Sequence, residues 1–208
     1  CNGTLNGNNC NGEWILDPGD LNGIDDDNWD ADATTLIDDL IGWDFVGNEG
    51  NSDNDPKPDL LQEYYSGWNH GTHVAGILSA LTNNNEGISS ASYNGQLMPL
   101  KCAMENDGQN LSIVNGYDAM LYAAKKGYYS DLQTIINASW GSELFSHFEL
   151  ETVTIICENY NGIIVSSAGN GFNNQQINAM TFPAAYDPVI SAVSYTHLRA
   201  HETDSYLV

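Results

Sequence analysis

Two histidines stand three residues apart at the start of an apolar segment, in the stretch NHGTHVAG from Asn69 to Gly76. A neutral imidazole at the mouth of a cleft can act as a general base near pH 7. A surface or core histidine without chemistry is the plainer alternative. A metal site shared by His70 and His73 is a third interpretation, but the Glu of a His-Glu-x-x-His motif is absent. On these residues alone, the three interpretations stay open.

The elements that would position this histidine follow from the periodicity of apolar residues. Small polar segments directly follow two predicted strands, at Ser139–Gly141 and at Ala168–Asn170. Strands and helices alternate, which predicts an α/β fold with a mainly parallel sheet, and functional residues gather at the carboxyl ends of such strands. The predicted helices span 71–81, 112–126 and 148–160, and the predicted strands span 96–104, 134–138, 162–167 and 189–193.

The composition excludes two classes of partner. The 208 residues carry a formal net charge of -23, so nucleic acid and anionic membrane surfaces would repel the chain. No run of eighteen apolar residues exists to span a membrane. The stretch 1–69 is acidic and rich in Gly, Asn and Asp, which predicts a loop-rich segment before an α/β core over 70–193. We expect a monomer.

Four segments, taken in order, carry a resemblance to a known family. NHGTHVAGI, IINASWGS (Ile135–Ser142), IIVSSAGNGFNN (Ile163–Asn174) and FPAAYDPVISAV (Phe182–Val193) resemble the conserved segments of subtilisin-like serine proteases, the subtilases. The resemblance covers about residues 13–193. It implies a three-layer α/β fold with a mainly parallel central sheet, here truncated. It also implies a secreted endopeptidase that hydrolyses peptide bonds in protein or peptide substrates through an acyl-enzyme.

The resemblance also assigns roles to residues of this chain. His70 would be the general base, His73 would be structural, and the side-chain amide of Asn170 would donate to the oxyanion. The segment after the first strand would pair with the substrate backbone and form a wall of the specificity pocket. The implied substrate-binding residues are Ser139, Trp140, Gly141, Ala168 and Gly169.

Two parts of the catalytic triad are missing from the sequence. The chain contains no Gly-Thr-Ser and no Asp-Ser/Thr-Gly, so we expect the nucleophile and the orienting Asp to lie outside this fragment. Asp17, after Trp14-Ile15-Leu16, is the nearest mimic, but the polar residues before it do not suit a buried strand. We therefore expect residues 1–193 to be a partial catalytic domain that is inactive alone.

The last residues, 194–208, differ in composition from the rest of the chain. SYTHLRAHETDSYLV resembles read-through of adapter sequence at a broken gene end, which predicts a non-native tail; a natural divergent tail is the alternative. Two other functions remain open. One is a non-catalytic subtilase-like pseudoprotease that binds calcium or peptides, and the other is an extracellular calcium-binding module without protease ancestry.

The acidic segment suggests a cation. Asp26, Asn28, Asp30 and Asp32 alternate at every second residue, and oxygen ligands on a loop suit Ca²⁺. A solvated or salt-adapted surface is the alternative. The cysteines fit a secreted protein: the pair at 1 and 10 could close a short disulfide, whereas Cys102 and Cys157 lie in apolar segments and are expected to be buried and unbridged.

Overall fold

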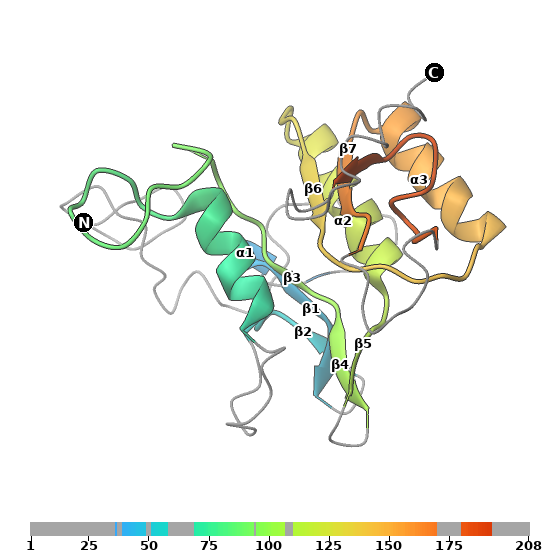
Figure 1. The fold of residues 1–208 in the computed structure, drawn as a ribbon, viewed down its shortest axis with the longest axis horizontal. Helices are drawn as coiled ribbons and strands as arrows, with labels where there is room; N and C mark the ends of the chain where they lie inside the picture. Colours follow the sequence, from blue (N-terminus) through green and yellow to red (C-terminus); the bar gives the residue numbers. More distant parts are fainter. Residues whose placement is uncertain are drawn as a thin grey trace. The chain divides into compact units, whose positions relative to one another are not determined.

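The chain forms two compact units, the first ending at Asn115 and the second beginning at Gly116 (Figure 1). The structure is a computed structural model. It describes Leu36 and residues 39–48, 51–57, 69–93, 95–106, 110–169 and 180–192.

The first unit contains a mixed sheet built around a strand that sequence analysis missed. A 3-10 turn, η1 (Asp39–Ile41), leads into β1 (Trp43–Asn48). β1 pairs antiparallel with β2 (Asn51–Asp53) and parallel with β3 (Leu100–Lys101). The acidic segment predicted to be loop-rich therefore also supplies the middle strand of this sheet. Burial does not alternate along it, since Trp43, Asp44 and Val46 are all buried.

The strand predicted over 96–104 is two strands with different partners. β3 pairs with β1, whereas β4 (Ala103–Asn106) pairs antiparallel with β5 (Asn110–Ile113) in a hairpin. Cys102 separates β3 from β4, and its carbonyl accepts a hydrogen bond from the Val114 amide (2.7 Å). One apolar run in the sequence thus serves two sheets.

The helix predicted over 112–126 begins later than expected. α2 spans Gly116–Tyr129, and Ile113 belongs to β5 instead. Asn115 has φ of 56°, a left-handed conformation that separates the strand from the helix. The helix also continues past its predicted end at residue 126, and Gly127 lies inside it, where a Cβ would collide with the Thr134 hydroxyl.

The helix that begins with the candidate base matches its prediction. α1 spans His70–Ser79. Its glycines suggest close packing, but α1 has no buried residue, and among the described residues no atom lies within 4 Å of a Cβ position at Gly71 or Gly76. Tight packing of this small-residue face therefore stays a prediction.

The second unit holds the parallel sheet that the sequence predicted. β6 (Ile135–Ala138), β7 (Ile163–Ser167) and β8 (Ile190–Ala192) are parallel neighbours in that order. α3 (His147–Asn159) is the crossover from β6 to β7. These bounds confirm the predicted strands and the third helix, and with them the α/β class.

One face of this sheet is buried against helices, and side chains on the other face are more exposed. Side chains alternate along β6 and β7, so Ile136 and Ile164 are buried while Ile135 is 68% exposed. α2 and α3 pack against each other, and each contacts the sheet (Figure 1). The buried core between helices and sheet consists of Ala119, Met120, Tyr122, Ala123, Ala124, Val153, Ile156, Ile136, Ala138 and Ile164.

The described cysteines are free thiols, as predicted. Cys102 and Cys157 are half-buried rather than fully buried. The cysteines at positions 1 and 10 lie outside the described residues.

Cys102 gives a prediction about stability in alkali. Burial, helped by the nearby Asp44 carboxylate, raises the pKa of its thiol from 9.0 to about 12. The folded thiol keeps its proton to higher pH than the unfolded thiol. The contribution of this group to the free energy of unfolding is therefore fully present below pH 9 and is lost as pH rises toward 12. We expect the free energy of unfolding to fall by up to about 1.4 kcal/mol per pH unit from this group. Urea titrations between pH 8 and 11 should show that the free energy of unfolding falls less steeply with pH in Cys102→Ala than in the unmodified protein. An equal fall with pH in both proteins would contradict the assignment.

Candidate active site

The two segments predicted to bind substrate leave the same edge of the sheet in the second unit. β6 and β7 are parallel and in register, with Ala138 opposite Ser166. The buried Ser166 hydroxyl donates to the Ala138 carbonyl (3.1 Å), which ties the two strands together at their carboxyl ends. Ser139 and Ala168 follow this pair, so the structure brings their segments to one place, as the strand pattern predicted.

The first segment is fixed against a loop that comes much later in the chain. Ser142 and Phe182 exchange two backbone hydrogen bonds, of 2.9 Å and 2.7 Å. A Cβ at Gly141 would lie 3.2 Å from the Phe182 carbonyl oxygen and 3.4 Å from Thr181 Cβ. Glycine therefore allows this close approach. Within the segment, the Asn137 side-chain amide donates to the Ser139 hydroxyl (2.8 Å).

The second segment turns sharply after β7. Gly169 has φ of 88°, which favours glycine over any residue with a side chain. Thr181 Cγ2 lies 3.8 Å from the position of its missing Cβ. Thr181 thus borders Gly141 as well as Gly169. Sequence analysis missed this residue, since only tertiary contact places it here.

Trp140, predicted to be a wall of the specificity pocket, is contacted by an aromatic side chain from α2. Its indole meets the Tyr117 ring edge to face, with centroids 5.4 Å apart and an interplanar angle of 85°. Tyr117 is the second residue of α2. Burial first, and then the Glu149 carboxylate and the Tyr186 hydroxyl, raise the pKa of Tyr117 well above its ordinary value. Hydrogen bonds with both partners contribute to this shift.

Tyr186 links this aromatic pair to the start of α3. Ser146 is the N-cap of the helix, and its hydroxyl accepts from the Glu149 amide (3.4 Å). Ser146 and Glu149 have the spacing of a capping box, in which the acid usually bonds the N-cap amide directly. Here the Tyr186 hydroxyl stands between them: it accepts from the Ser146 amide (3.2 Å) and lies 3.1 Å from Glu149 Oε2 and 3.0 Å from the Ser146 carbonyl.

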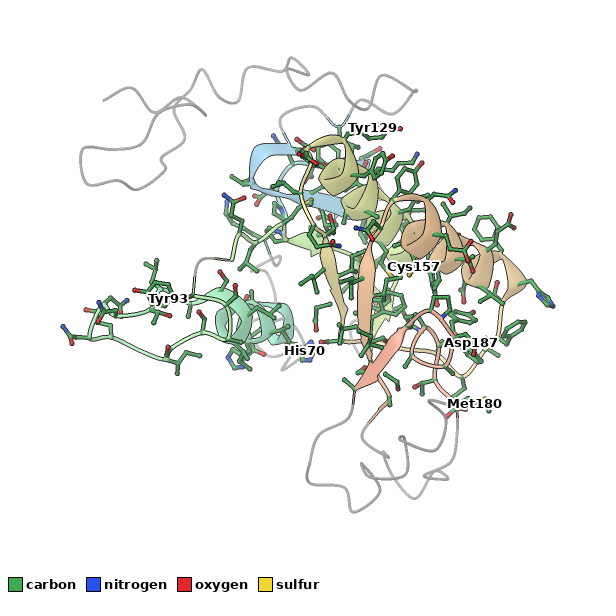
Figure 2. The ribbon with its side chains drawn as sticks, turned by 90° about the horizontal axis from the view of Figure 1, so that it is seen from above. His70, Tyr93, Tyr129, Cys157, Met180 and Asp187 are labelled. Carbon is green, nitrogen blue, oxygen red and sulfur yellow. The ribbon has the colours of Figure 1, made fainter. Side chains whose placement is uncertain are left out.

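The candidate base lies in the first unit, at the first position of α1. His70 is exposed, and the N-cap residue Asn69 makes no side-chain capping bond that would cover the helix start. Figure 2 shows His70 at this end of the helix. The imidazole is therefore accessible to a reactant. His73 is exposed as well, so the structural role predicted for it has no support in the described part of the chain.

Several predicted site residues fall outside the residues that the structure describes. They are the oxyanion donor Asn170, the mimic Asp17, and the calcium candidates Asp26, Asn28, Asp30 and Asp32. Within the described ranges, no three His, Cys, Asp or Glu side chains form a group able to hold a metal. No helix in those ranges has the length and apolar character needed to cross a membrane.

Comparison with known proteins identifies the family of this chain. The model described as "Subtilase family" matches residues 23–206. A thermophilic serine proteinase of Bacillus sp. (strain AK1) is 33% identical over 152 residues, which is 73% of this chain and 32% of the relative. The halolysin-like extracellular serine protease Nep of Natrialba magadii is 30% identical over 195 residues, which is 89% of this chain and 32% of the relative.

A solved structure supports the fold. Sphericase superimposes with a TM-score of 0.55 and 25% identity, over 72% of this chain and 44% of that protein. The chain spans about a third of the length of the two curated relatives. The family match covers most of the chain, including part of the segment 194–208, whose origin stays a prediction. This chain, with its α/β subtilisin-like fold, therefore belongs to the subtilase family.

Proposed function

We propose that this chain is part of a secreted serine endopeptidase whose substrate binds across the carboxyl ends of β6 and β7. One observation carries the proposal: parallel pairing of Ala138 with Ser166 brings the two segments that resemble subtilase substrate-binding motifs to one edge of the sheet. The close approach at Gly141 and the left-handed turn at Gly169 suit segments along which an extended peptide could lie.

In the proposed mechanism His70 moves the proton. It takes the hydroxyl proton of a serine as the serine oxygen bonds to the scissile carbonyl carbon, and the carbonyl oxygen becomes an oxyanion. The Asn170 side-chain amide donates to that oxyanion. The carbon–nitrogen bond then breaks, the amine leaves with the proton from His70, and an acyl-enzyme remains. Water, deprotonated by His70, hydrolyses the acyl-enzyme and regenerates the serine.

The proposal assigns the serine and the carboxylate that orients His70 to residues beyond this chain. Neither family motif occurs in its sequence. The substrates are proteins or peptides, and the enzyme is a monomer that acts outside the cell. Support for an extracellular location comes from relatives such as Nep, whose name describes it as extracellular.

Hydrolysis of a protein substrate tests the proposal. Protein expressed from the complete gene should release acid-soluble peptides from casein, and a sulfonyl fluoride that modifies serine proteases should abolish the release. The chain 1–208 alone should release none. Absence of cleavage by the complete protein, when it is folded, would overturn the proposed function.

We also propose structural calcium bound by Asp26, Asn28, Asp30 and Asp32. The support is chemical, since these are the oxygen ligands that Ca²⁺ prefers. Binding to the folded state alone should raise the free energy of unfolding, by about 2.7 kcal/mol at a hundred times the Kd. Calorimetric titration of Ca²⁺ into metal-free protein should release or absorb heat and raise Tm. The double variant Asp30→Asn/Asp32→Asn should lose both effects, and a titration without heat or Tm shift in the unmodified protein would contradict the site.

A further inference from the structure

Trp140 is contacted by an aromatic side chain from a different element of the second unit. It follows β6, whereas the Tyr117 ring that meets its edge comes from the first turn of α2. An indole attached to a loop would otherwise sample several rotamers. Edge-to-face aromatic pairs contribute about 0.5–1.5 kcal/mol beyond simple burial, enough to favour one orientation.

The other end of Tyr117 is fixed as well. Its hydroxyl lies near the Glu149 carboxylate and the Tyr186 hydroxyl, which together with burial raise its pKa. Glu149 is in the first turn of α3, and Tyr186 is only 3% exposed. Tyr117 is therefore attached through its ring to Trp140 and through its hydroxyl to a cluster that also caps α3. A tyrosine present only to fill the core would not need both attachments.

The hydroxyl cluster is itself well anchored. The rings of Phe182 and Tyr186 contact each other, with centroids 4.7 Å apart and planes tilted by 39°. Phe182 also makes the two backbone bonds that hold Ser142 beside the proposed substrate-binding segment. The loop that fixes Gly141 is thus the same loop that positions Tyr186. One network connects the backbone of the proposed binding segment with the side chain of Trp140.

We infer that Tyr117 is a positioning residue that fixes the orientation of Trp140, and that the fixed indole makes the enzyme prefer an apolar substrate side chain beside it. The inference rests on the proposed function, because only that function places substrate against Trp140. Tyr117 does not touch the substrate in this account. By orienting the indole of Trp140, it changes how strongly the enzyme prefers an apolar over a polar substrate side chain.

The test compares two series of peptide substrates in the complete enzyme. In one series a single Leu is placed in turn at each position that flanks the scissile bond. In the other series Ser takes the place of that Leu, and the peptides are otherwise identical. At the position that contacts Trp140, Tyr117→Ala should lower the Leu-to-Ser ratio of kcat/KM about 2- to 10-fold, by loss of the aromatic pair. Most of the change should appear in KM for the Leu peptide. Tyr117→Phe, which keeps the aromatic ring, should have the same Leu-to-Ser ratio of kcat/KM as the unmodified enzyme.

A matched control removes another tyrosine from the same helix. Tyr129 is 60% exposed near the end of α2 (Figure 2), and Tyr129→Ala should leave the ratio unchanged. If Tyr117→Ala does not fold, Tyr117→Leu keeps the packing volume without the aromatic edge and should show the same reduced ratio. An active wild-type enzyme whose ratio is unchanged in the folded Tyr117 variants would overturn the inference alone. An inactive wild-type enzyme would overturn the proposed function instead.

Discussion

Replacing His70 with Ala in the complete enzyme should lower kcat about 10⁶-fold, the size of the effect in subtilisin itself. The imidazole is the only group of the proposed mechanism that both accepts the serine proton and returns it to the leaving amine. KM should change little, because His70 begins α1 whereas the proposed substrate-binding segments follow β6 and β7. Steady-state kinetics on a peptide substrate measures both constants.

The control for this prediction is another exposed histidine. His147 begins α3, and its ring meets the Phe145 ring edge to face. His147→Gln should keep kcat within about twofold, as expected for a surface substitution. An unchanged Tm would show that His70→Ala is folded. A folded His70→Ala enzyme with nearly normal kcat would remove this residue from the mechanism.

Replacing Lys101 with Met should lower the free energy of unfolding of the first unit by about 3–5 kcal/mol. Lys101 Nζ lies 2.7 Å from Asp44 Oδ2, and the two side chains are 9% and 3% exposed. The other oxygen of Asp44 accepts from the amides of Val46 and Gly47, each at 2.9 Å. Without the ammonium group, the buried carboxylate loses the cation that offsets the cost of removing it from water. Urea unfolding measures the loss.

Two further variants separate the buried pair from an ordinary surface pair. Lys57 and Asp55 form an ion pair at 3.2 Å, but their side chains are 75% and 58% exposed, so Lys57→Met should change stability by less than about 1 kcal/mol. In Lys101→Met/Asp44→Asn, the Asn oxygen can still accept the two amide bonds, and stability should partly recover. Equal losses in the two lysine variants would contradict the role of burial.

Much of the fold was predictable because strong periodicity coincides with local elements. The apolar strands of 134–138 and 162–167 and the helices at His70 and Phe148 appear within a residue or two of their predicted bounds. The errors occur where a tertiary partner decides. Ile113 lies four residues before Tyr117 and so fits a helical stripe, yet pairing with Ala103 puts it in a hairpin. The central strand β1 was hidden in an acidic, glycine-rich background.

The candidate site divides in the same way. Ser139–Gly141 and Ala168–Gly169 were predictable because they directly follow strands whose parallel pairing sets their position. The contacts of Tyr117 and Thr181 were not, because each meets partners distant in sequence and leaves no local pattern. The Ser-x-x-Glu spacing that ends at Glu149 predicts a helix start. It does not predict that the Tyr186 hydroxyl lies between the Ser146 and Glu149 groups.

The central claim is that His70 activates a serine of the same protein. The most direct measurement is labelling of the complete gene product with diisopropyl fluorophosphate, followed by mass spectrometry of the labelled peptide. This reagent needs no knowledge of substrate specificity. The account predicts one equivalent of label, on a serine that follows residue 193 in the complete gene product, and a rate of labelling that falls by orders of magnitude in His70→Ala. Absence of label on the folded protein, or equal labelling of His70→Ala, would contradict the account and indicate a non-catalytic relative of the proteases.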